Sequence, residues 1–324
     1  MSKLTWHFQK RPEAILSIVN ETPAEWVKFI DPPEENPTPG KKVIGRHYIP
    51  DGVANDMIMA GAAQEWFDRN LPAFEKAPYV HCWELPNEPP VGSPKQRAAL
   101  VEFSLDVIWL MHLRGLKTAA LCLSVGWPEV GTARDFIPIL EKTDFWAMHQ
   151  YGYHDMRRDS EWYSLRHRKT VEELGVDVPP LLITESGLEP GGWKKFTDHA
   201  GYQEQLAWYD DELQKDAYVE CATLFTSGPE REWKAFDIDE EMSLWIKDRF
   251  PPVNVSATIR EQAWNQVGVS YNPDAAFSRE ARKLGLGAPM TGEFDYDGFR
   301  AQGFVGGVLY CEVGHWGEIE FVVW

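Results

Sequence analysis

The sequence contains few cysteines and no cysteine motif. Four occur among its 324 residues, at positions 82, 122, 221 and 311, and none of them forms a CxxC pair. The first three lie in apolar stretches that have the character of strands. We therefore interpret them as buried free thiols rather than as disulfide partners or zinc ligands.

Long apolar stretches are equally scarce. No run reaches the roughly 18 apolar residues that cross a membrane, and the N-terminal MSKLTWHFQKRPEA lacks the apolar core of a secretory signal. We expect a soluble chain with no membrane partner. Its compartment stays open. The sequence fits a cytoplasmic protein, a protein released in the manner of a phage lysin, and a protein whose leader has been removed.

Positive charge is in short supply. The 32 lysines and arginines face 50 acidic residues, which gives a formal charge of −18 at pH 7. Such a surface repels nucleic acid phosphates and anionic lipids, so no nucleic acid partner is expected. Hydrophobic residues at 44% and charged residues at 25% are ordinary for a folded protein with a sizeable core.

Several motifs of cofactor chemistry and hydrolysis are missing. The sequence has no GxGxxG or GxxxxGK[ST] loop for a nucleotide, no HExxH pair for zinc, and no GxSxG elbow for an esterase. His81, His149 and His154 lie in or beside strand-like runs, but not at the spacing of metal ligands. We expect neither a cofactor nor a catalytic metal.

The stretches that are present alternate regularly. Short runs rich in β-branched and aromatic residues recur between helix-like segments, which predicts parallel strands joined by crossover helices. We count eight such runs, at residues 4–9, 26–31, 42–49, 79–89, 117–125, 144–152, 180–187 and 219–227. Eight strand–helix units in a chain of this length predict an α/β fold, the (β/α)8 TIM barrel.

The segments between these runs predict helices and one long loop. In residues 95–115, apolar residues recur at three- and four-residue steps, and Gly115 supplies a stop signal. A second amphipathic stretch covers residues 201–215. Residues 31–42, DPPEENPTPGKK, are dense in proline and polar residues and predict a surface loop.

The pattern changes near residue 250. We expect a catalytic barrel over residues 1–249 and a small C-terminal extension over residues 250–324. The extension contains a helix-like stretch at residues 259–268, followed by a segment rich in glycine and aromatic residues. It either packs on the barrel or serves as a module that binds a cell wall or another partner.

The first candidate for catalysis is a glutamate in WELPNEP, residues 83–89. Asn87 and Glu88 follow the fourth predicted strand, on the face where barrel enzymes keep their active sites. A carboxyl group in such a place can act as a general acid when burial or a nearby carboxylate makes it hold its proton more tightly.

The second candidate ends an apolar strand. Glu185 lies in LLITESG, residues 181–187, at the end of the seventh predicted strand. Taken alone, it fits a surface carboxylate or a partner of a helix N-terminus as well. Because strands four and seven lie across the mouth of a barrel from each other, both glutamates can point at one bond.

Asn-Glu-Pro after strand four and a glutamate ending strand seven resemble clan A of the glycoside hydrolases, the retaining barrel enzymes. The resemblance implies Glu88 as the acid/base and Glu185 as the nucleophile of a double displacement, with their carboxyl groups about 5 to 5.5 Å apart. It also implies that Asn87 hydrogen-bonds the 2-hydroxyl of the sugar.

Further residues resemble elements that clan members place around the sugar. MHQYGYH, residues 148–154, resembles their His-x-Tyr element and makes His149 and Tyr151 candidates, with Tyr151 donating to the nucleophile. Arg46 and His47 end the third predicted strand, where members often carry a basic residue.

One element of the clan is missing. Its members usually end strand eight with a tryptophan that forms the sugar platform, whereas LFTSGP contains none. Trp233, which lies six residues beyond that strand, is the candidate to replace it.

The tail adds a second resemblance. LGLGAPMTGEF and QGFVGGVLY are similar to the LGFP-type repeats of cell-wall-associated bacterial proteins, which implies a bacterial cell-wall glycan as the substrate. The whole sequence thus predicts a retaining glycosidase with a carbohydrate substrate, and its 15 tryptophans suit sugar rings. The alternative is a barrel that binds carbohydrate without turnover. The oligomeric state stays open.

Overall fold

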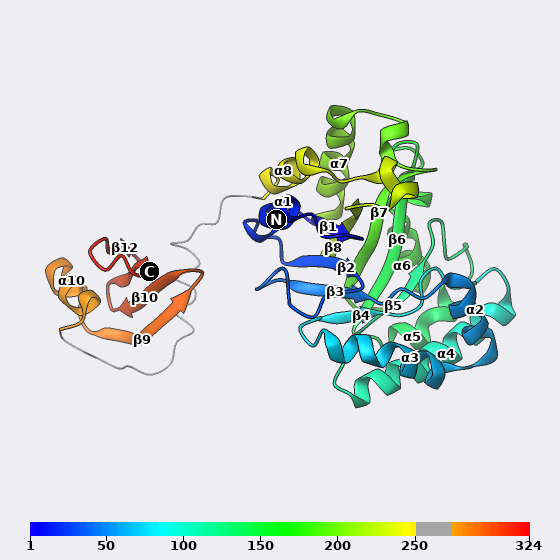
Figure 1. The fold of residues 1–324 in the computed structure, drawn as a ribbon, viewed down its shortest axis with the longest axis horizontal. Coiled ribbons are helices and arrows are strands. Elements are labelled where there is room, and N and C mark those ends of the chain that lie inside the picture. The colour runs from blue at the N-terminus through cyan, green and yellow to red at the C-terminus, as the bar shows by residue number, and fades with distance from the viewer. Residues whose placement is uncertain (251–273) are drawn as a thin grey trace. The chain divides into compact units, whose positions relative to one another are not determined.

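The computed structural model describes residues 1–250 and 274–324. The chain divides into two compact units, residues 1–251 and 252–324. Figure 1 labels the elements of both units. The helix-like stretch predicted at residues 259–268 lies outside the described residues.

The first unit is a closed barrel of parallel strands, so the predicted TIM-barrel fold is confirmed. Each strand pairs with the next in sequence, and β8 closes the ring by pairing with β1. Its strands are β1 Leu4–Phe8, β2 Trp26–Ile30, β3 Lys42–Arg46, β4 Cys82–Glu84, β5 Thr118–Leu123, β6 Phe145–Tyr153, β7 Leu181–Glu189 and β8 Val219–Ser227.

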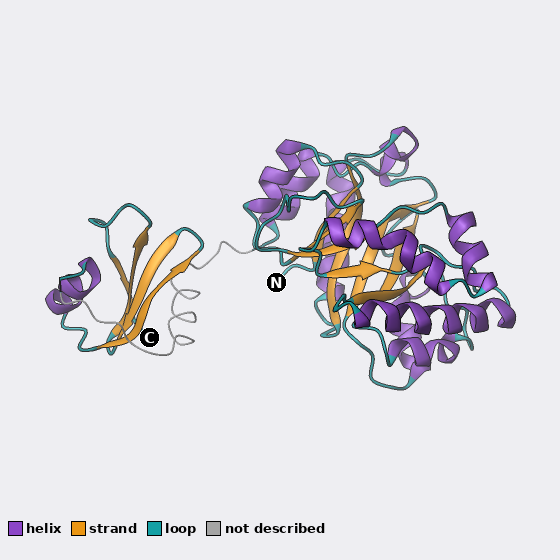
Figure 2. Cartoon of the chain, turned by 60° about the horizontal axis from the view of Figure 1, so that its bottom comes forward, coloured by secondary structure: helices purple, strands orange, loops and turns teal. Residues whose placement is uncertain are grey.

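Helices surround these strands, as Figure 2 shows. The α-helices of this unit are α1 Glu13–Asn20, α2 Asp51–Ala60, α3 Ala63–Lys76, α4 Pro94–Leu113, α5 Ile137–Leu140, α6 Arg166–Leu174, α7 His199–Leu213 and α8 Glu240–Asp248. A capping box begins α4, because the Ser93 side chain accepts a hydrogen bond from the Gln96 backbone N–H. Gly115 follows its end with φ 70°, a conformation that favours glycine.

Two expectations about this unit need correction. The crossover from β2 to β3 contains no helix in residues 31–41, all of which are described, so the loop itself makes the connection. The fourth strand is three residues long rather than eleven. Pro86, Pro89 and Pro90 have no backbone N–H to give to a ladder, which keeps the segment after β4 out of the sheet.

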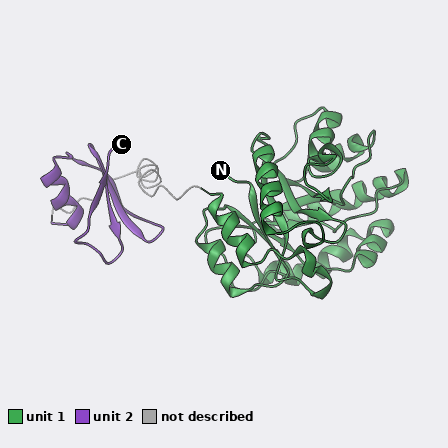
Figure 3. Cartoon of the chain, turned by 90° about the horizontal axis from the view of Figure 1, so that it is seen from above, with its two compact units in different colours: residues 1–251 green, residues 252–324 purple. Residues whose placement is uncertain are grey.

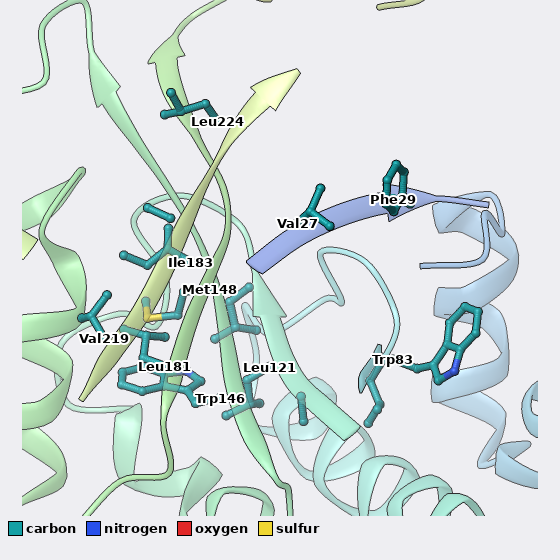
Figure 4. Close-up of a cluster of buried hydrophobic side chains, with 14 of the residues drawn as sticks. Val27, Phe29, Trp83, Leu121, Trp146, Met148, Leu181, Ile183, Val219 and Leu224 are labelled. Atoms are coloured by element: carbon teal, nitrogen blue, oxygen red, sulfur yellow. The ribbon is translucent and has the colours of Figure 1, made fainter. Parts of the chain in front are cut away.

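The barrel buries both faces of its strands. Outward side chains such as Val27, Ile183 and Leu224 belong to a core that also contains helix residues, and Figure 4 shows a part of it. Inward side chains form an apolar layer that includes Trp26 and Ile44. Because successive side chains alternate, the next inward residues toward the carboxyl ends are charged, namely Lys28, Arg46 and Glu84.

The second unit is a small antiparallel sheet with one described helix, coloured separately in Figure 3. Its elements are α10 Ala276–Leu284, β9 Pro289–Tyr296, β10 Phe299–Phe304, β11 Gly307–Glu312 and β12 Glu320–Val322, and the strand order is β12-β11-β10-β9. Phe277 and Ala281 of α10 pack with Phe304 and Leu309 of the sheet. The similarity of this unit to LGFP-type repeats stays a prediction.

The cysteines are free and buried, as the sequence predicts. Cys82, Cys122 and Cys221 lie in the apolar layer inside the barrel, and Cys311 lies on β11. Among the described residues, no helix has the length and apolar character needed to cross a membrane.

Candidate active site

A cleft of about 630 Å³ opens at the carboxyl ends of the barrel strands. Such a volume suits a small-molecule or sugar-binding site. Its lining includes every predicted site residue except His149, namely Arg46, His47, Asn87, Glu88, Tyr151, Glu185 and Trp233. The sequence therefore identified residues that the fold does bring together.

Glu88 projects from the segment after β4. Its backbone N–H donates to the Cys122 carbonyl on β5 over 3.0 Å, which ties this segment to the next strand. Its φ of 40° lies in the left-handed region, a costly conformation for a residue with a side chain and one that clusters at functional sites. The Glu88 side chain is 36% exposed, and its Oε1 lies 3.0 Å from Nδ1 of His149.

Glu185 lies deeper, with 9% of its side chain exposed. A register shift between β6 and β7 places His149 opposite Glu185. The Tyr151 hydroxyl, two residues along β6, donates to Oε2 of Glu185 over 2.9 Å. Arg46 donates to Oε1 over 2.9 Å. The predicted hydrogen bond from Tyr151 is therefore present.

Beneath Glu185 lies an ion pair, Lys28 and Glu84, that the sequence did not predict. Lys28 and Glu84 are fully buried, and the Lys28 ammonium lies 2.9 Å from Oε2 of Glu84 and 3.5 Å from Oε1 of Glu185. We call this pair and the charged or ionisable groups around it the floor cluster, which consists of His7, Lys28, Arg46, Glu84 and Glu185. The sequence signal that could have revealed this pair is a charged residue inside an apolar strand, namely Lys28 in WVKFI and Glu84 in CWE.

Positive charges decide the ionisation of the floor cluster. Burial alone would raise the pKa of Glu185, but the charges of His149, Lys28 and Arg46 outweigh it and hold that pKa well below its usual range. Burial opposes ionisation of Glu84 as well, yet Lys28 and Arg46 lower its pKa. Both carboxyl groups are therefore carboxylates at neutral pH.

The remaining neighbours of Glu185, Tyr151 and His7, carry no charge at neutral pH. Burial raises the pKa of Tyr151 well above its usual value, and the charge of Glu185 adds to that effect. Burial and the charge of Lys28 lower the pKa of His7. The Tyr151 hydroxyl therefore keeps the proton that it shares with Glu185.

Glu88, His149 and Glu185 form a compact triad. One side-chain oxygen of each glutamate and one ring nitrogen of His149 all lie within 4.8 Å of one another. Among the described residues these are also the groups that could hold a metal ion. However, Glu185 already contacts two cations, Lys28 and Arg46, and a third positive charge there would be repelled.

Asn87 and His47 take different positions. Oδ1 of Asn87 accepts a hydrogen bond from Arg46, while its amide N–H donates to Asp51 over 3.2 Å. Asn87 is thus fixed beside the floor cluster. His47 turns to the mouth of the cleft instead, where its Nδ1 lies 2.8 Å from Asp31.

Aromatic side chains form one wall of the cleft. Trp233 lies on the 3-10 helix η4 Arg231–Phe236 and is 37% exposed. Its ring meets that of Phe225 edge-on, with centroids 5.4 Å apart. Phe225, near the end of β8, lines the cleft at the place where the sequence lacks the expected tryptophan. Phe225 was not among the predicted site residues, because the resemblance implies a tryptophan at the end of this strand.

The mouth of the cleft is acidic. We call its outer carboxylates the mouth group, and they are Asp31, Asp51, Glu189, Glu230 and Glu232. Glu230 pairs with exposed Lys10 over 3.0 Å. Burial raises the pKa of Glu189, and the charge of Glu88 raises it further. Glu189 therefore faces the triad as a further carboxyl group.

The fold and the cleft define a TIM-barrel protein with two glutamates across its mouth. No protein-family description matches the chain, and no curated protein sequence matches it. Solved structures do match in fold. A curdlan-specific exo-β-1,3-glucanase of GH128 subgroup III from Blastomyces gilchristii, in complex with glucose, has 15% identity and a TM-score of 0.50. The match covers 76% of this chain and 97% of that one.

A second similar structure is a GH2 β-galacturonidase from Eisenbergiella tayi bound to glycerol. Its identity is 13% and its TM-score 0.52, and the match covers 76% of this chain and 50% of that one. At such identities the two comparisons establish the barrel fold and leave the chemistry to the residues of the cleft.

Proposed function

We propose that this chain is a glycoside hydrolase that cleaves an oligo- or polysaccharide with retention of configuration. The observation that carries the proposal is the pair formed by Glu88 and Glu185, which have side-chain oxygens within 4.8 Å of each other. Retaining enzymes hold their two carboxyl groups about 5 to 5.5 Å apart, whereas inverting enzymes leave about 6.5 to 9.5 Å for a water molecule.

The surroundings of the two glutamates support different roles. Glu185 contacts Lys28, Arg46 and Tyr151, which favour its ionised form and suit a nucleophile. Glu88 is more exposed and its carboxyl group contacts His149. It has room to exchange a proton with the leaving group and with water.

The reaction proceeds in two displacements. In the first, a Glu185 oxygen bonds to the anomeric carbon while the glycosidic bond breaks and Glu88 gives its proton to the leaving oxygen. In the second, Glu88 takes a proton from water, the water oxygen bonds to the anomeric carbon, and the ester to Glu185 breaks. Two inversions give net retention.

Neighbouring side chains support the sugar during these steps. Asn87, fixed by Arg46 and Asp51, can donate to the sugar 2-hydroxyl, and this bond strengthens as the oxocarbenium-like transition state forms. Phe225 and Trp233 offer apolar faces on one wall of the cleft.

Three classes of substrate suit the proposed reaction. The exo-β-1,3-glucanase and the β-galacturonidase that share the fold suggest β-glucans and uronic-acid glycosides as trial substrates. The LGFP-like segment of the tail suggests a bacterial cell-wall glycan. All three substrate classes therefore belong in the substrate panel.

The deciding experiment measures release of product from aryl glycosides, aryl uronides among them, and from β-1,3-glucans and peptidoglycan, by wild type, Glu88→Ala and Glu185→Ala. We expect turnover by wild type, and we expect both variants to lose nearly all of it on substrates with poor leaving groups. Azide should rescue Glu185→Ala and give a glycosyl azide of inverted configuration, and should rescue Glu88→Ala with retained configuration.

Glu141→Ala is a matched control, because Glu141 is exposed on the barrel unit and outside the cleft. It should keep the wild-type rate. If wild type binds a glycan of the panel but cleaves none, the hydrolase proposal fails and a carbohydrate-binding barrel takes its place. An inverted product from wild type would reject the retaining mechanism and leave the hydrolase proposal standing.

A further inference from the structure

The floor cluster contains a buried ion pair, Lys28 and Glu84, that takes no part in making or breaking bonds in the proposed reaction. Lys28 and Glu84 have no exposed side-chain surface, although Glu84 borders the cleft. Burying two charges costs several kcal/mol for each ion unless their mutual attraction and further hydrogen bonds offset the cost. A pair of this kind directly beneath a reactive carboxylate calls for a functional explanation.

The contacts of Lys28 join the pair to Glu185. The ammonium donates to the backbone carbonyl of Thr184, the residue before Glu185, over 2.9 Å. It also lies 3.5 Å from the Glu185 carboxylate. Lys28 therefore holds both the strand and the side chain of the proposed nucleophile.

Glu84 lies close to both Lys28 and Arg46. Its Oε2 lies 2.9 Å from the Lys28 ammonium and 3.9 Å from Nε of Arg46. Lys28 and Arg46 are also the cations that contact Glu185. Two carboxylates and two cations thus alternate, and the four charges sum to zero.

We propose that Lys28, anchored by Glu84, is a positioning residue that keeps the Glu185 carboxylate ionised and aimed into the cleft. This inference rests on the proposed function for its catalytic consequence. The charge that Lys28 supplies can be measured without any substrate.

Other groups around Glu185 contribute to the same electrostatic balance. The titratable groups that face the Glu185 carboxylate or the Lys28–Glu84 pair are His7 on β1, Arg46 on β3, Glu88 after β4, Cys122 on β5, His149 and Tyr151 on β6, and Glu189 on β7. All of them stay in place in the variants below, so a change reports on the removed pair.

The first test titrates the Glu185 carboxyl carbon by NMR in the full chain labelled with ¹³C at glutamate Cδ, with Glu185→Gln to assign the signal. In Lys28→Met we expect the proton affinity of Glu185 to rise about tenfold to a thousandfold, the usual effect of losing an opposite charge at this range. In Lys28→Met/Glu84→Gln, which removes one charge of each sign, we expect a smaller rise.

The second test follows kcat/KM against pH on a substrate that wild type cleaves. The acid limb should move to higher pH in Lys28→Met, and less so in the double variant, with kcat reduced more than KM is changed. The double variant keeps the test usable if Lys28→Met does not fold, because it leaves no carboxylate without its cation.

Lys42→Met/Glu25→Gln is the matched control. That pair has the same 2.9 Å separation, but it is exposed and lies at the opposite end of β3 from Arg46. It should leave the titration and the pH profile unchanged. If the folded Lys28 variants also leave both unchanged, the pair is merely structural and the inference is wrong. If wild type shows no turnover while the NMR titration moves as expected, the proposed function fails and the electrostatic role of Lys28 stands.

Discussion

The floor cluster and the mouth group are both built around carboxylates, yet they manage negative charge differently. In the floor cluster, Glu84 and Glu185 share the cations Lys28, which is fully buried, and Arg46, whose side chain is 12% exposed. In the mouth group, Asp51, Glu189 and Glu232 form no ion pair with a described residue. Water stabilises a charge at the surface, whereas a buried charge needs a partner. The comparison separates charges that tune a reaction from charges that meet an incoming molecule.

Breaking one ion pair in each region gives the largest expected contrast. Removing Lys28 by Lys28→Met leaves two buried carboxylates with one shared cation and should lower the free energy of unfolding by about 3 to 5 kcal/mol. Lys10→Met, which breaks the exposed pair with Glu230 at the mouth, should cost about 0 to 1 kcal/mol. Urea denaturation at neutral pH measures both. Equal losses would show that burial does not distinguish the two regions.

Acid should cost stability through the floor cluster rather than through the mouth group. The pKa values of Glu84 and Glu185 lie below their ordinary value of 4.5, so each carboxylate stabilises the fold fully above that pH. This stabilisation is lost as the pH falls through the folded-state pKa. We expect unfolding free energy to decline steeply below pH 4.5, and less steeply in Glu185→Gln. Glu232→Gln at the mouth is the control and should keep the wild-type slope.

The aromatic wall should affect binding rather than chemistry. Trp233→Ala removes an exposed indole at the mouth and should raise KM about fivefold with kcat little changed, because aromatic contacts are worth about 1 kcal/mol. Steady-state kinetics on a wild-type substrate measures this. Trp109→Ala, on an exposed face of α4, is the control and should alter neither constant. A fall in kcat alone would place Trp233 nearer the reacting atoms than the structure does.

The smallest expected effect concerns the charge of the substrate. The unpaired mouth carboxylates should make kcat/KM for a glycan with uronic acids about threefold lower than for its neutral counterpart in dilute buffer. The difference should vanish near 1 M salt, where screening acts over about 3 Å. Glu232→Gln, which removes one of these unpaired carboxylates, should reduce it in dilute buffer. A preference for the acidic glycan would mean that the mouth group does not govern approach.

Local patterns predicted most of what locates the cleft. The alternation of eight apolar, strand-like runs with helix-like segments predicted the barrel, and a carboxylate after an apolar strand singled out Glu88 and Glu185. The partners of those glutamates were harder to predict. Lys28 reaches Glu185 across 157 residues of sequence, and no local pattern states which strands lie opposite each other in space.

Some details depended on backbone geometry that a residue pattern does not contain. Arg46 and His47 both line the cleft, but adjacent residues leaving a strand diverge, and His47 pairs with Asp31 at the mouth. The register shift that brings His149 beside Glu185 is likewise invisible in MHQYGYH. The roles assigned to the site residues and the likeness of the tail to wall-associated repeats stay predictions.

The buried thiols give each compact unit its own reporter of unfolding. Cys82, Cys122 and Cys221 lie inside the barrel, and Cys311 lies in the second unit with 1% of its surface exposed. Burial raises the pKa of the Cys82 and Cys122 thiols, so they should react with an alkylating reagent only when the barrel opens. Mass spectrometry of the alkylated wild-type protein would then time the opening of the two units separately, with no engineered probe.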